Sequence, residues 1–441
     1  MKRYDKYKDS GVDRIGEIPE HWVVNKFKSI LTVHGRIGFR GYTVSDLVDK
    51  GEGAITISPS NMEEGKLNLK SSSYLSWDKY YESPEIMVKE GDFLLVKTAS
   101  IGKLAYVKKL TEKATVNPQI LILKNVKICR PFFFYHLLSS VTQKQLNTEK
   151  IGSTIFTISE QKIKNFSTIL PPLSEQQAIA SFLDDKTSKI DQTISIKEKE
   201  IELLKERHQI LIQKTVTKGL DDKVKLKDSG VEWIGEVPEH WEVRKLMGVC
   251  RFIRGNSPFG KDELLEEGEY VAIQYGKTYK VNEVNKEYGY YVNNEFYKKS
   301  QVVSYGDIIL ISTSETIDDL GHTVYYRRND LGLLGGEQIM LKPKQEEING
   351  QYLYFTSKVF SKELRKFATG IKVFRFNIND LKTIFTVLPP LSEQNEIANY
   401  IETKSTKISK AISLKQQEIE RLREYKTVLI DNVVTGKISV C

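Results

Sequence analysis

Apolar residues recur along residues 170–219 at intervals that alternate between four and three, the spacing of the inner seam of a coiled coil. The same spacing returns along residues 388–441, displaced by 218 residues. The seam positions are Ile190, Ile194, Lys197, Ile201, Leu204, His208, Leu211 and Thr215, and then Ile408, Ile412, Lys415, Ile419, Leu422, Lys426, Leu429 and Val433. Because Lys, Glu and Gln crowd the other positions, the pattern favours a helix–helix seam over a helix buried in its own domain.

The simplest partner for each long helix is the other copy. If a pseudo-twofold axis relates the two halves of the chain, one self-complementary surface closes on its copy, whereas a pure translation leaves each surface open. The helix pair is therefore predicted to be antiparallel. At about 1.5 Å per residue, the segment from Ser174 to Thr215 would span roughly 60 Å, so we expect a rigid spacer.

Two further repeats mark the same duplication. KDSGVDRIGEIPEHWVVNK from Lys8 returns as KDSGVEWIGEVPEHWEVRK from Lys227, and LPPLSEQ occurs twice, 218 residues apart. In each PEHW segment we expect the proline to set a turn and the tryptophan to be an anchor. His21 and His240 are interpreted as packing or capping residues, because no Ser, Cys or acidic partner recurs at matched spacing beside them.

These repeats predict four segments. They are a first module at 1–169, a helix at 170–220, a second module at 221–387 and a second helix at 388–441. Between the repeats the modules diverge, yet GDFLLV from Gly91 corresponds to GDIILI from Gly306, and each is typical of a buried strand that leads into a polar loop.

Other landmarks keep the same order in both modules. The sequence aligns Arg40 with Arg254 and Gln119 with Gln338. The modules are predicted to contain helical segments at 130–147 and 351–367, and to end in a glycine turn and a strand at 152–157 and 370–376. We therefore predict an α+β fold, in which a long antiparallel two-helix coiled coil separates two mixed α/β modules, with internal pseudo-twofold duplication.

Composition describes a globular chain. Its 441 residues, 40% of them hydrophobic, suffice for two or three domains. No apolar run approaches the length of a membrane helix and the N-terminus does not resemble a signal peptide, so a cytoplasmic location is expected. Cys129, Cys250 and Cys441 are scattered without a CxxC pair, which suggests neither a disulfide framework nor a zinc site. The net charge of +8 permits nucleic-acid binding without establishing it.

The loops of both modules offer side chains that can read DNA. Guanine edges and phosphates call for Arg or Lys, and adenine calls for Asn or Gln. A single such residue is more often a solvated surface residue, so the recurrence at matched places in both halves carries the prediction. The first-module candidates are Arg36, Arg40, Tyr42, Lys97, Thr98, Ser100, Lys103, Asn117, Gln119, Ser153 and Thr154. The second-module candidates are Arg251, Arg254, Asn256, Gln274, Tyr275, Lys277, Ser312, Thr313, Ser314, Gln338, Lys372 and Arg375.

Enzyme motifs fail on inspection. GNSPFGKD from Gly255 has the spacing of a phosphate-binding loop, but Asp262 stands where Ser or Thr should ligate magnesium. In ILPPL and VLPPL, Leu170 and Leu388 stand where a base-methylating enzyme needs Asn, Asp or Ser. There is no GxGxxG and no HExxH. The residues therefore assemble neither a catalytic set nor a metal site.

The arrangement of these motifs resembles the specificity subunit of type I restriction-modification systems. That family has two PEHW-led variable modules, each followed by an LPPLSEQ helix. GRIGFRGYT from Gly35, GDFLLVKTASIGK from Gly91 and NPQI from Asn117 look like its target-recognition domains, and the resemblance covers essentially the whole chain. The first module matches better than the second, where STSETIDDLGH replaces the lysine-rich loop.

The resemblance implies a non-catalytic subunit that reads a bipartite DNA sequence, one half per module, with the helices as a ruler. It also implies two modification (methyltransferase) subunits bound to the helical region, and motor-nuclease subunits that join them. S-adenosylmethionine, ATP and magnesium would then belong to those partners. The alternatives are a single-chain methyltransferase or nuclease with an unrecognised active site, and a coiled-coil scaffold without a DNA role.

Overall fold

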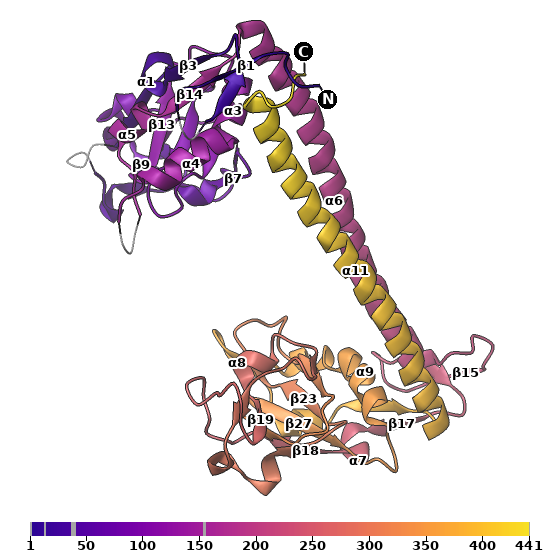
Figure 1. Ribbon diagram of the computed structural model, residues 1–441. Helices are drawn as coiled ribbons and strands as arrows, with labels where there is room; N and C mark the ends of the chain where they lie inside the picture. The colour runs from indigo at the N-terminus through magenta and orange to yellow at the C-terminus, as the bar shows by residue number, and fades with distance from the viewer. Residues whose placement is uncertain (1, 13–14, 37–40, 153–155, 441) are drawn as a thin grey trace. The chain divides into compact units, whose positions relative to one another are not determined.

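The computed structural model describes residues 2–12, 15–36, 41–152 and 156–440 (Figure 1). The chain divides into two compact units, which we call unit 1 (Met1–Lys197 and Gln417–Cys441) and unit 2 (Glu198–Gln416). It passes from unit 1 to unit 2 within the long helix α6 (Leu173–Lys218) and returns within the long helix α11 (Leu391–Val434). The domain boundaries given above stay a prediction.

Unit 1 is organised by a strand that is buried on both faces, β10 (Phe93–Val96). Successive side chains of a strand point to opposite faces, so Phe93 and Leu95 join a core shared with the helices, whereas Leu94 and Val96 join a core between two sheets. The first sheet has the order β11 (Leu104–Tyr106), β10, β13 (Ile120–Lys124), β4 (Thr32–Gly35), and the second has β12 (Ala114–Val116), β6 (Gly53–Ile57), β9 (Ser73–Ser76), β5 (Leu47–Val48).

Unit 2 repeats this plan around β23 (Ile308–Ile311). Ile308 and Leu310 pack into the core beside the helices, and Ile309 packs into the core on the other face. Its first sheet has the order β18 (Cys250–Arg254), β27 (Gln338–Pro343), β23, β25 (Thr323–Tyr326), β20 (Glu283–Val284), and its second has β21 (Tyr291–Val292), β19 (Tyr270–Ile273), β26 (Gly332–Leu334), β22 (Val302–Val303). The mixed α/β character predicted from the sequence is confirmed.

Shorter elements complete each unit. Unit 1 contains β1 (Tyr7–Asp9), β2 (Glu17–Pro19), β3 (Val23–Lys26), α1 (Phe27–Ile30), β7 (Met62–Glu63), β8 (Lys66–Leu67), α2 (Trp77–Tyr81), α3 (Arg130–Leu138), α4 (Ser140–Glu149), α5 (Glu160–Lys164) and β14 (Ser167–Leu170). Unit 2 contains β15 (Leu226–Asp228), β16 (Glu236–Pro238), β17 (Glu242–Lys245), α7 (Leu246–Val249), α8 (Tyr275–Thr278), β24 (Thr313–Ser314), α9 (Gly350–Phe360), β28 (Phe374–Arg375), α10 (Ile378–Leu381) and β29 (Phe385–Leu388). The helix predicted at 130–147 is interrupted at Ser139, which has extended backbone angles.

The repeated PEHW and LPPLSEQ motifs bind each other. In unit 1 the buried indole of Trp22 donates a hydrogen bond to Glu175 of the LPPLSEQ segment (2.9 Å). In unit 2 Trp241 donates to Glu393 at the same distance, 2.9 Å. Each glutamate also contacts the neighbouring histidine, at 2.5 Å in unit 1 and 2.7 Å in unit 2. The tryptophan anchor predicted from the sequence therefore has an acidic partner at the start of a long helix.

The glutamine of LPPLSEQ fixes a second element. Gln176 accepts a hydrogen bond from the N–H of Cys129, the residue before α3 (3.0 Å), and donates to the carbonyl of Pro171 (2.9 Å). Gln394 does the same for Asn349, before α9 (2.8 Å), and for Pro389 (2.9 Å). A single motif thus holds the start of a long helix and the start of a module helix together.

Within each unit, α6 and α11 run antiparallel. In unit 1, Asp191 binds Lys426 (2.6 Å) and Lys197 binds Glu418 (2.6 Å). In unit 2, Glu200 binds Lys415 (2.5 Å) and His208 contacts Ser405 (2.7 Å). Partner numbers on α11 fall as those on α6 rise, which is the antiparallel order. The polar residues that interrupt the apolar seam are therefore accommodated by polar partners on the facing helix.

The seam positions are the less exposed ones of each long helix. Ile190, Ile201, Ile419 and Leu429 are buried, and Ile194, Leu204, Leu211, Ile408, Ile412 and Leu422 are partly buried. Among the described residues, none of the helices combines the length and apolar character needed to cross a bilayer.

Candidate nucleic-acid interface

In unit 1, polar loops meet where the parallel strands β6 and β12 end. The N–H of Asn117, just beyond β12, donates to the carbonyl of Ile57 at the end of β6 (2.9 Å). Lys103, from the loop after β10, donates to the carbonyl of Pro59 in the loop after β6 (2.6 Å). Loops that follow neighbouring parallel strands meet at one edge of a sheet, which is where such sheets commonly bind ligands. We call residues 58–61, 97–103, 117–119 and 156–158 edge 1.

Backbone hydrogen bonds build edge 1. The N–H of Lys97 donates to the carbonyl of Gln119 (2.8 Å), and the carbonyl of Lys97 accepts from the N–H of Ile158 (2.9 Å). Beside them, the hydroxyls of Thr98 and Thr157 lie 3.1 Å apart. Segments distant in sequence are thus joined through the main chain, which leaves the side chains free to differ.

Unit 2 builds the same frame where β19 and β26 end. The N–H of Ser312 donates to the carbonyl of Glu337 (3.3 Å), and the carbonyl of Ser312 accepts from the N–H of Phe376 (3.2 Å). Thr313 pairs with Arg375 in an antiparallel ladder. We call residues 274–278, 312–319, 335–338 and 369–376 edge 2.

The β-ladders correct the sequence alignment of the two modules by one residue. The last residues of the matched strands β10 and β23 pair with Ile120 and Gln338, respectively. Gln338 therefore corresponds to Ile120, and Glu337 corresponds to Gln119. Because a one-residue shift turns a strand side chain to the opposite face, the predicted match of Gln119 with Gln338 is wrong.

The same ladders correct the match predicted for Arg254. Arg254 pairs with Ile339 of β27, and Gly35 pairs with Leu121 of β13. Ile339 and Leu121 are equivalent in the register just described, so Arg254 corresponds to Gly35. The predicted match of Arg254 with Arg40 is therefore wrong.

Some of the predicted DNA contacts are buried and bind the protein itself. The guanidinium of Arg36 donates to the carbonyl of Val116 (3.3 Å) and the hydroxyl of Thr115 (3.2 Å), and burial lowers its pKa. Gln338 accepts from the hydroxyl of Thr278 (2.6 Å) and donates to the carbonyl of Ile273 (2.8 Å). The buried candidates are Arg36, Ser312, Thr313, Ser314 and Gln338. In this structure they support the loops from below.

The other described candidates reach the surface. Ser100, Lys103, Arg251, Arg254, Asn256, Lys372 and Arg375 are exposed, and Tyr42, Lys97, Thr98, Asn117, Gln119, Gln274, Tyr275 and Lys277 are partly exposed. Arg251 and Arg254 are three residues apart on β18 and so point to opposite faces of their sheet. Arg40, Ser153 and Thr154 lie outside the described residues. That the candidates contact DNA stays a prediction.

The two edges differ in charge. In edge 1 the loop 97–103 carries lysines, whereas in edge 2 the exposed residues Glu315 and Glu337 carry carboxylates. Tyr275 reports their proximity, because its pKa is raised first by burial and then by the negative charges of Glu315, Asp319 and Glu337. A lysine-rich surface and an acidic surface thus stand on equivalent frames.

Two residues of edge 2 were missed by sequence reasoning. Ile371 is 95% exposed in a turn closed by hydrogen bonds between Thr369 and Arg375. Its signal in the sequence was an isoleucine between Gly370 and Lys372 in a segment otherwise read as polar. Glu337 was hidden because the neighbouring glutamine was taken as the match for Gln119.

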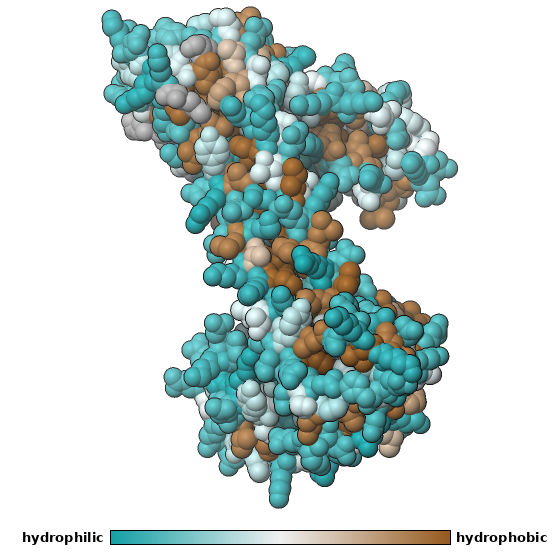
Figure 2. All heavy atoms as spheres, turned by 90° about the vertical axis from the view of Figure 1, so that its right-hand side faces the viewer, coloured by the Kyte–Doolittle hydropathy of each residue, from teal (hydrophilic) through white to brown (hydrophobic). Residues whose placement is uncertain are grey.

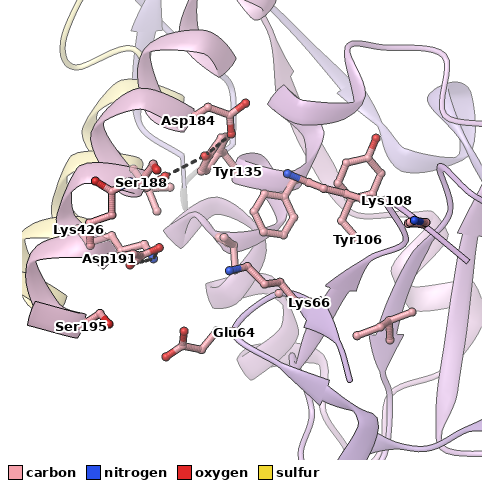
Figure 3. A pocket seen from close by; sticks show the side chains of 18 residues that line it. Glu64, Lys66, Tyr106, Lys108, Tyr135, Asp184, Ser188, Asp191, Ser195 and Lys426 are labelled. Atoms are coloured by element: carbon pink, nitrogen blue, oxygen red, sulfur yellow. Dashed lines mark hydrogen bonds and ion pairs between the residues drawn. The ribbon is translucent and has the colours of Figure 1, made fainter. Parts of the chain in front are cut away.

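A second candidate site is a cavity of 820 Å³ in unit 1, between the β7–β8 hairpin, α3 and the long helices (Figure 3). The hydroxyl of Tyr135 donates to Asp184 (2.6 Å), and Lys426 is held by Asp191 (2.6 Å). Lys66 and Lys108 line the opposite wall. Unit 2 has a cavity of 560 Å³ at the equivalent place, lined by residues of α6, α9 and α11. The described residues hold no group of His, Cys, Asp and Glu suited to a metal ion.

Comparisons with known proteins agree on one family. A family model described as "Type I restriction modification DNA specificity domain" matches residues 19–206 and 238–423. A protein of Methanocaldococcus jannaschii named as the MjaX specificity subunit of a type I restriction enzyme is 29% identical over 437 residues, 97% of this chain and 96% of its own. The MjaVIII specificity subunit of the same organism is 27% identical over 368 residues, 81% of each chain.

Solved structures share the fold. One chain, from a structure described as "Structural basis underlying complex assembly and conformational transition of the type I R-M system", superposes with a TM-score of 0.71 at 16% identity, over 96% of this chain and 99% of that one. The HsdS subunit of Thermoanaerobacter tengcongensis gives a TM-score of 0.50 at 17% identity, over 96% of this chain and 98% of that one.

Proposed function

The chain belongs to the type I restriction-modification specificity subunits, and we propose that it reads a bipartite DNA target, with one half-site at edge 1 and the other at edge 2. As a specificity subunit it is the recognition part of an enzyme complex and not the catalytic part. The observation that carries the proposal is the frame built twice: the same main-chain hydrogen bonds support two different sets of exposed polar side chains.

A selection experiment tests the bipartite target. The purified chain, alone and assembled with its modification subunits, is incubated with duplexes that contain a long randomised segment, and bound duplexes are sequenced. The proposal expects two short blocks of specified bases separated by an unspecified gap. One continuous block, or no sequence preference in the assembled complex, would overturn it.

We further propose that two modification subunits dock on the long helices and that the restriction and motor subunits join through them. Apolar side chains gather on the helical part of the surface (Figure 2), although the inner seam is already covered. Ile196 and Leu414 are exposed and stand 218 residues apart, as are Ile210 and Val428. Exposed apolar patches of this kind mark interaction sites, and the duplication suits two copies of one partner.

In this proposal S-adenosylmethionine, ATP and magnesium belong to the partner subunits, and the complex works in the cytoplasm. Incubating the isolated chain with labelled S-adenosylmethionine and duplex DNA is the direct test. No transfer above a no-protein control is expected. Methyl transfer by the pure chain would favour the alternative of a single-chain methyltransferase.

The gap between half-sites is proposed to depend on the length of α6 and α11, because each runs unbroken from one unit into the other. Removing one heptad from each helix at corresponding positions keeps the seam in phase and shortens each by about 10 Å. At about 3.4 Å per base pair, the preferred gap should fall by roughly three base pairs. Some affinity should also be lost, because the half-sites rotate by about a quarter turn. An unchanged gap in a folded variant would contradict the proposal.

A further inference from the structure

Residue 337 and its counterpart Gln119 occupy one position in the two edges. We propose that this position reads a base in each half-site, and that Glu337 accepts a hydrogen bond from the exocyclic amino group of a cytosine or an adenine. The inference rests on the proposed function, because it assumes that edge 2 faces DNA. It assigns a specificity-determining role to a residue outside the sequence-derived candidates.

The backbone makes the two positions equivalent. The carbonyl of Gln119 accepts the N–H of the residue that follows β10 (2.8 Å), and the carbonyl of Glu337 accepts the N–H of the residue that follows β23 (3.3 Å). In both units the next residue begins the neighbouring strand, β13 or β27, in the same register with the central strand. Both side chains therefore leave the frame from the same point.

Rigid neighbours hold Glu337 on both sides. The hydroxyl of Ser312 donates to its carbonyl (3.1 Å), in addition to the Ser312 N–H. On the other side the fully buried amide of Gln338 is tied to Thr278 (2.6 Å) and Ile273 (2.8 Å). A recognition side chain has to start from a fixed backbone, and the position of Glu337 meets this requirement.

The backbone angle of Glu337 points to a use for its side chain. Its φ of 62° lies in the left-handed region, which costs a residue with a Cβ roughly 1–2 kcal/mol but costs glycine almost nothing. Glycines stand immediately before it, at 335 and 336. Among the described residues, the Glu337 carboxylate has neither an ion-pair partner nor a side-chain hydrogen bond. Strained positions of this kind are found at functional sites.

The chemistry of a carboxylate restricts what it can bind on DNA. Phosphates only accept hydrogen bonds, whereas in the major groove cytosine N4 and adenine N6 are the donors. Cations of edge 2, such as Lys372 and Arg375, can offset the repulsion between Glu337 and phosphates. Gln119 both donates and accepts, which suits the N6 and N7 of adenine. The matched positions thus differ in the hydrogen-bond pattern that they recognise.

The test is a reciprocal exchange in the full chain assembled with its modification subunits. Glu337→Gln and Gln119→Glu are each selected against duplexes that randomise both half-sites. Glu267→Gln is the matched control, because it removes the same charge from an exposed residue that precedes β19, at the other end of that strand.

In the wild type we expect one position of the second half-site to require cytosine or adenine, and the selected base distinguishes these two sources of the amino group. Glu337→Gln should reduce that preference by about 5- to 150-fold, the range for loss of one good base contact. The first half-site should not change. Gln119→Glu should alter one position of the first half-site only, and Glu267→Gln should alter neither.

Glu337→Gly separates recognition from stability. Glycine relieves the left-handed backbone, so the variant should melt at the same temperature or higher and still lose the base preference. A lower melting temperature would assign Glu337 a structural role and overturn the inference. It would also be overturned if Glu337→Gln left every position of the second half-site unchanged while the bipartite preference persisted. Absence of any bipartite preference in the wild type would instead overturn the proposed function.

Discussion

Edge 1 and edge 2 have the same main-chain hydrogen bonds and different side chains on top of them. Lys97 and Ser312 make equivalent backbone contacts, with Gln119 and Glu337 as their partners. The loops beyond them are lysine-rich in one unit and acidic in the other. The difference teaches that the frame is independent of the side chains it displays. A new recognition surface can therefore arise by substitution without any change to the fold.

The largest expected effect concerns the part that the two units share. Trp22→Ala and Trp241→Ala each remove a buried indole and its hydrogen bond to a glutamate of LPPLSEQ. Each should destabilise its own unit by about 3–5 kcal/mol, the usual cost of such a truncation. Hydrogen exchange resolved by peptide would show faster exchange confined to that unit.

Trp77→Ala is the control for the tryptophan variants, because this indole is 37% exposed and lies outside the motif. It should cost much less. If Trp22→Ala accelerated exchange equally in both units, the units would not be independent frames, and the comparison between them would lose its basis.

The frame was largely predictable from the sequence, because it is encoded by repeated and periodic signals. The heptad spacing predicted the long helices, and the runs from Gly91 and Gly306 predicted the buried central strands. The contact of Trp22 with Glu175 was not predicted. Both residues belong to repeated motifs, but they are 153 residues apart, and spacing within a motif carries no signal for a contact between motifs.

The recognition edges were less predictable. A short aligned segment, with a glutamine in each copy, placed Gln338 at the surface, whereas the ladder register buries it and exposes Glu337. Strand register depends on hydrogen bonds between distant segments, and a slip of one residue reverses which side chain is exposed. Arg36 was misjudged for a related reason, because burial of an arginine against β12 depends on tertiary contacts.

The cavities beside the long helices offer a second contrast between the units. Lys358 is the ninth residue of α9, and Leu138 is the ninth of α3. Burial lowers the pKa of Lys358 to about 7, while the charge of Glu283 acts in the opposite direction. Below pH 7 the lysine is charged in both the folded and the unfolded chain. Between pH 7 and about 10 only the unfolded chain binds the proton, so stability should rise with pH.

Urea unfolding of the wild type and Lys358→Met between pH 7 and 10 checks this prediction. The difference between their midpoints should shift in favour of the wild type as pH rises, since methionine cannot titrate. Leu138→Met is the matched substitution in unit 1 and should show no pH-dependent difference. Parallel curves for the wild type and Lys358→Met would contradict the assignment.

A smaller effect is expected at edge 1. Lys103→Ala removes an exposed cation whose amine binds the Pro59 carbonyl (2.6 Å). Binding should weaken mainly at the first half-site, by about 1–3 kcal/mol if a base contact is lost. If Lys103 meets a phosphate instead, the slope of log affinity against log salt should fall by about 0.9. Lys113→Ala, just before β12, removes a cation from the opposite end of that strand and should change neither quantity.

The central claim is that each unit reads its own half-site on a shared frame, and exchanging one module tests it most directly. Residues 227–387 are replaced by the equivalent module of a relative with a different target, and the chimaera is assembled with its modification subunits. Selection against randomised duplexes should return one new half-site and one unchanged half-site. A simultaneous change in both half-sites would contradict the account.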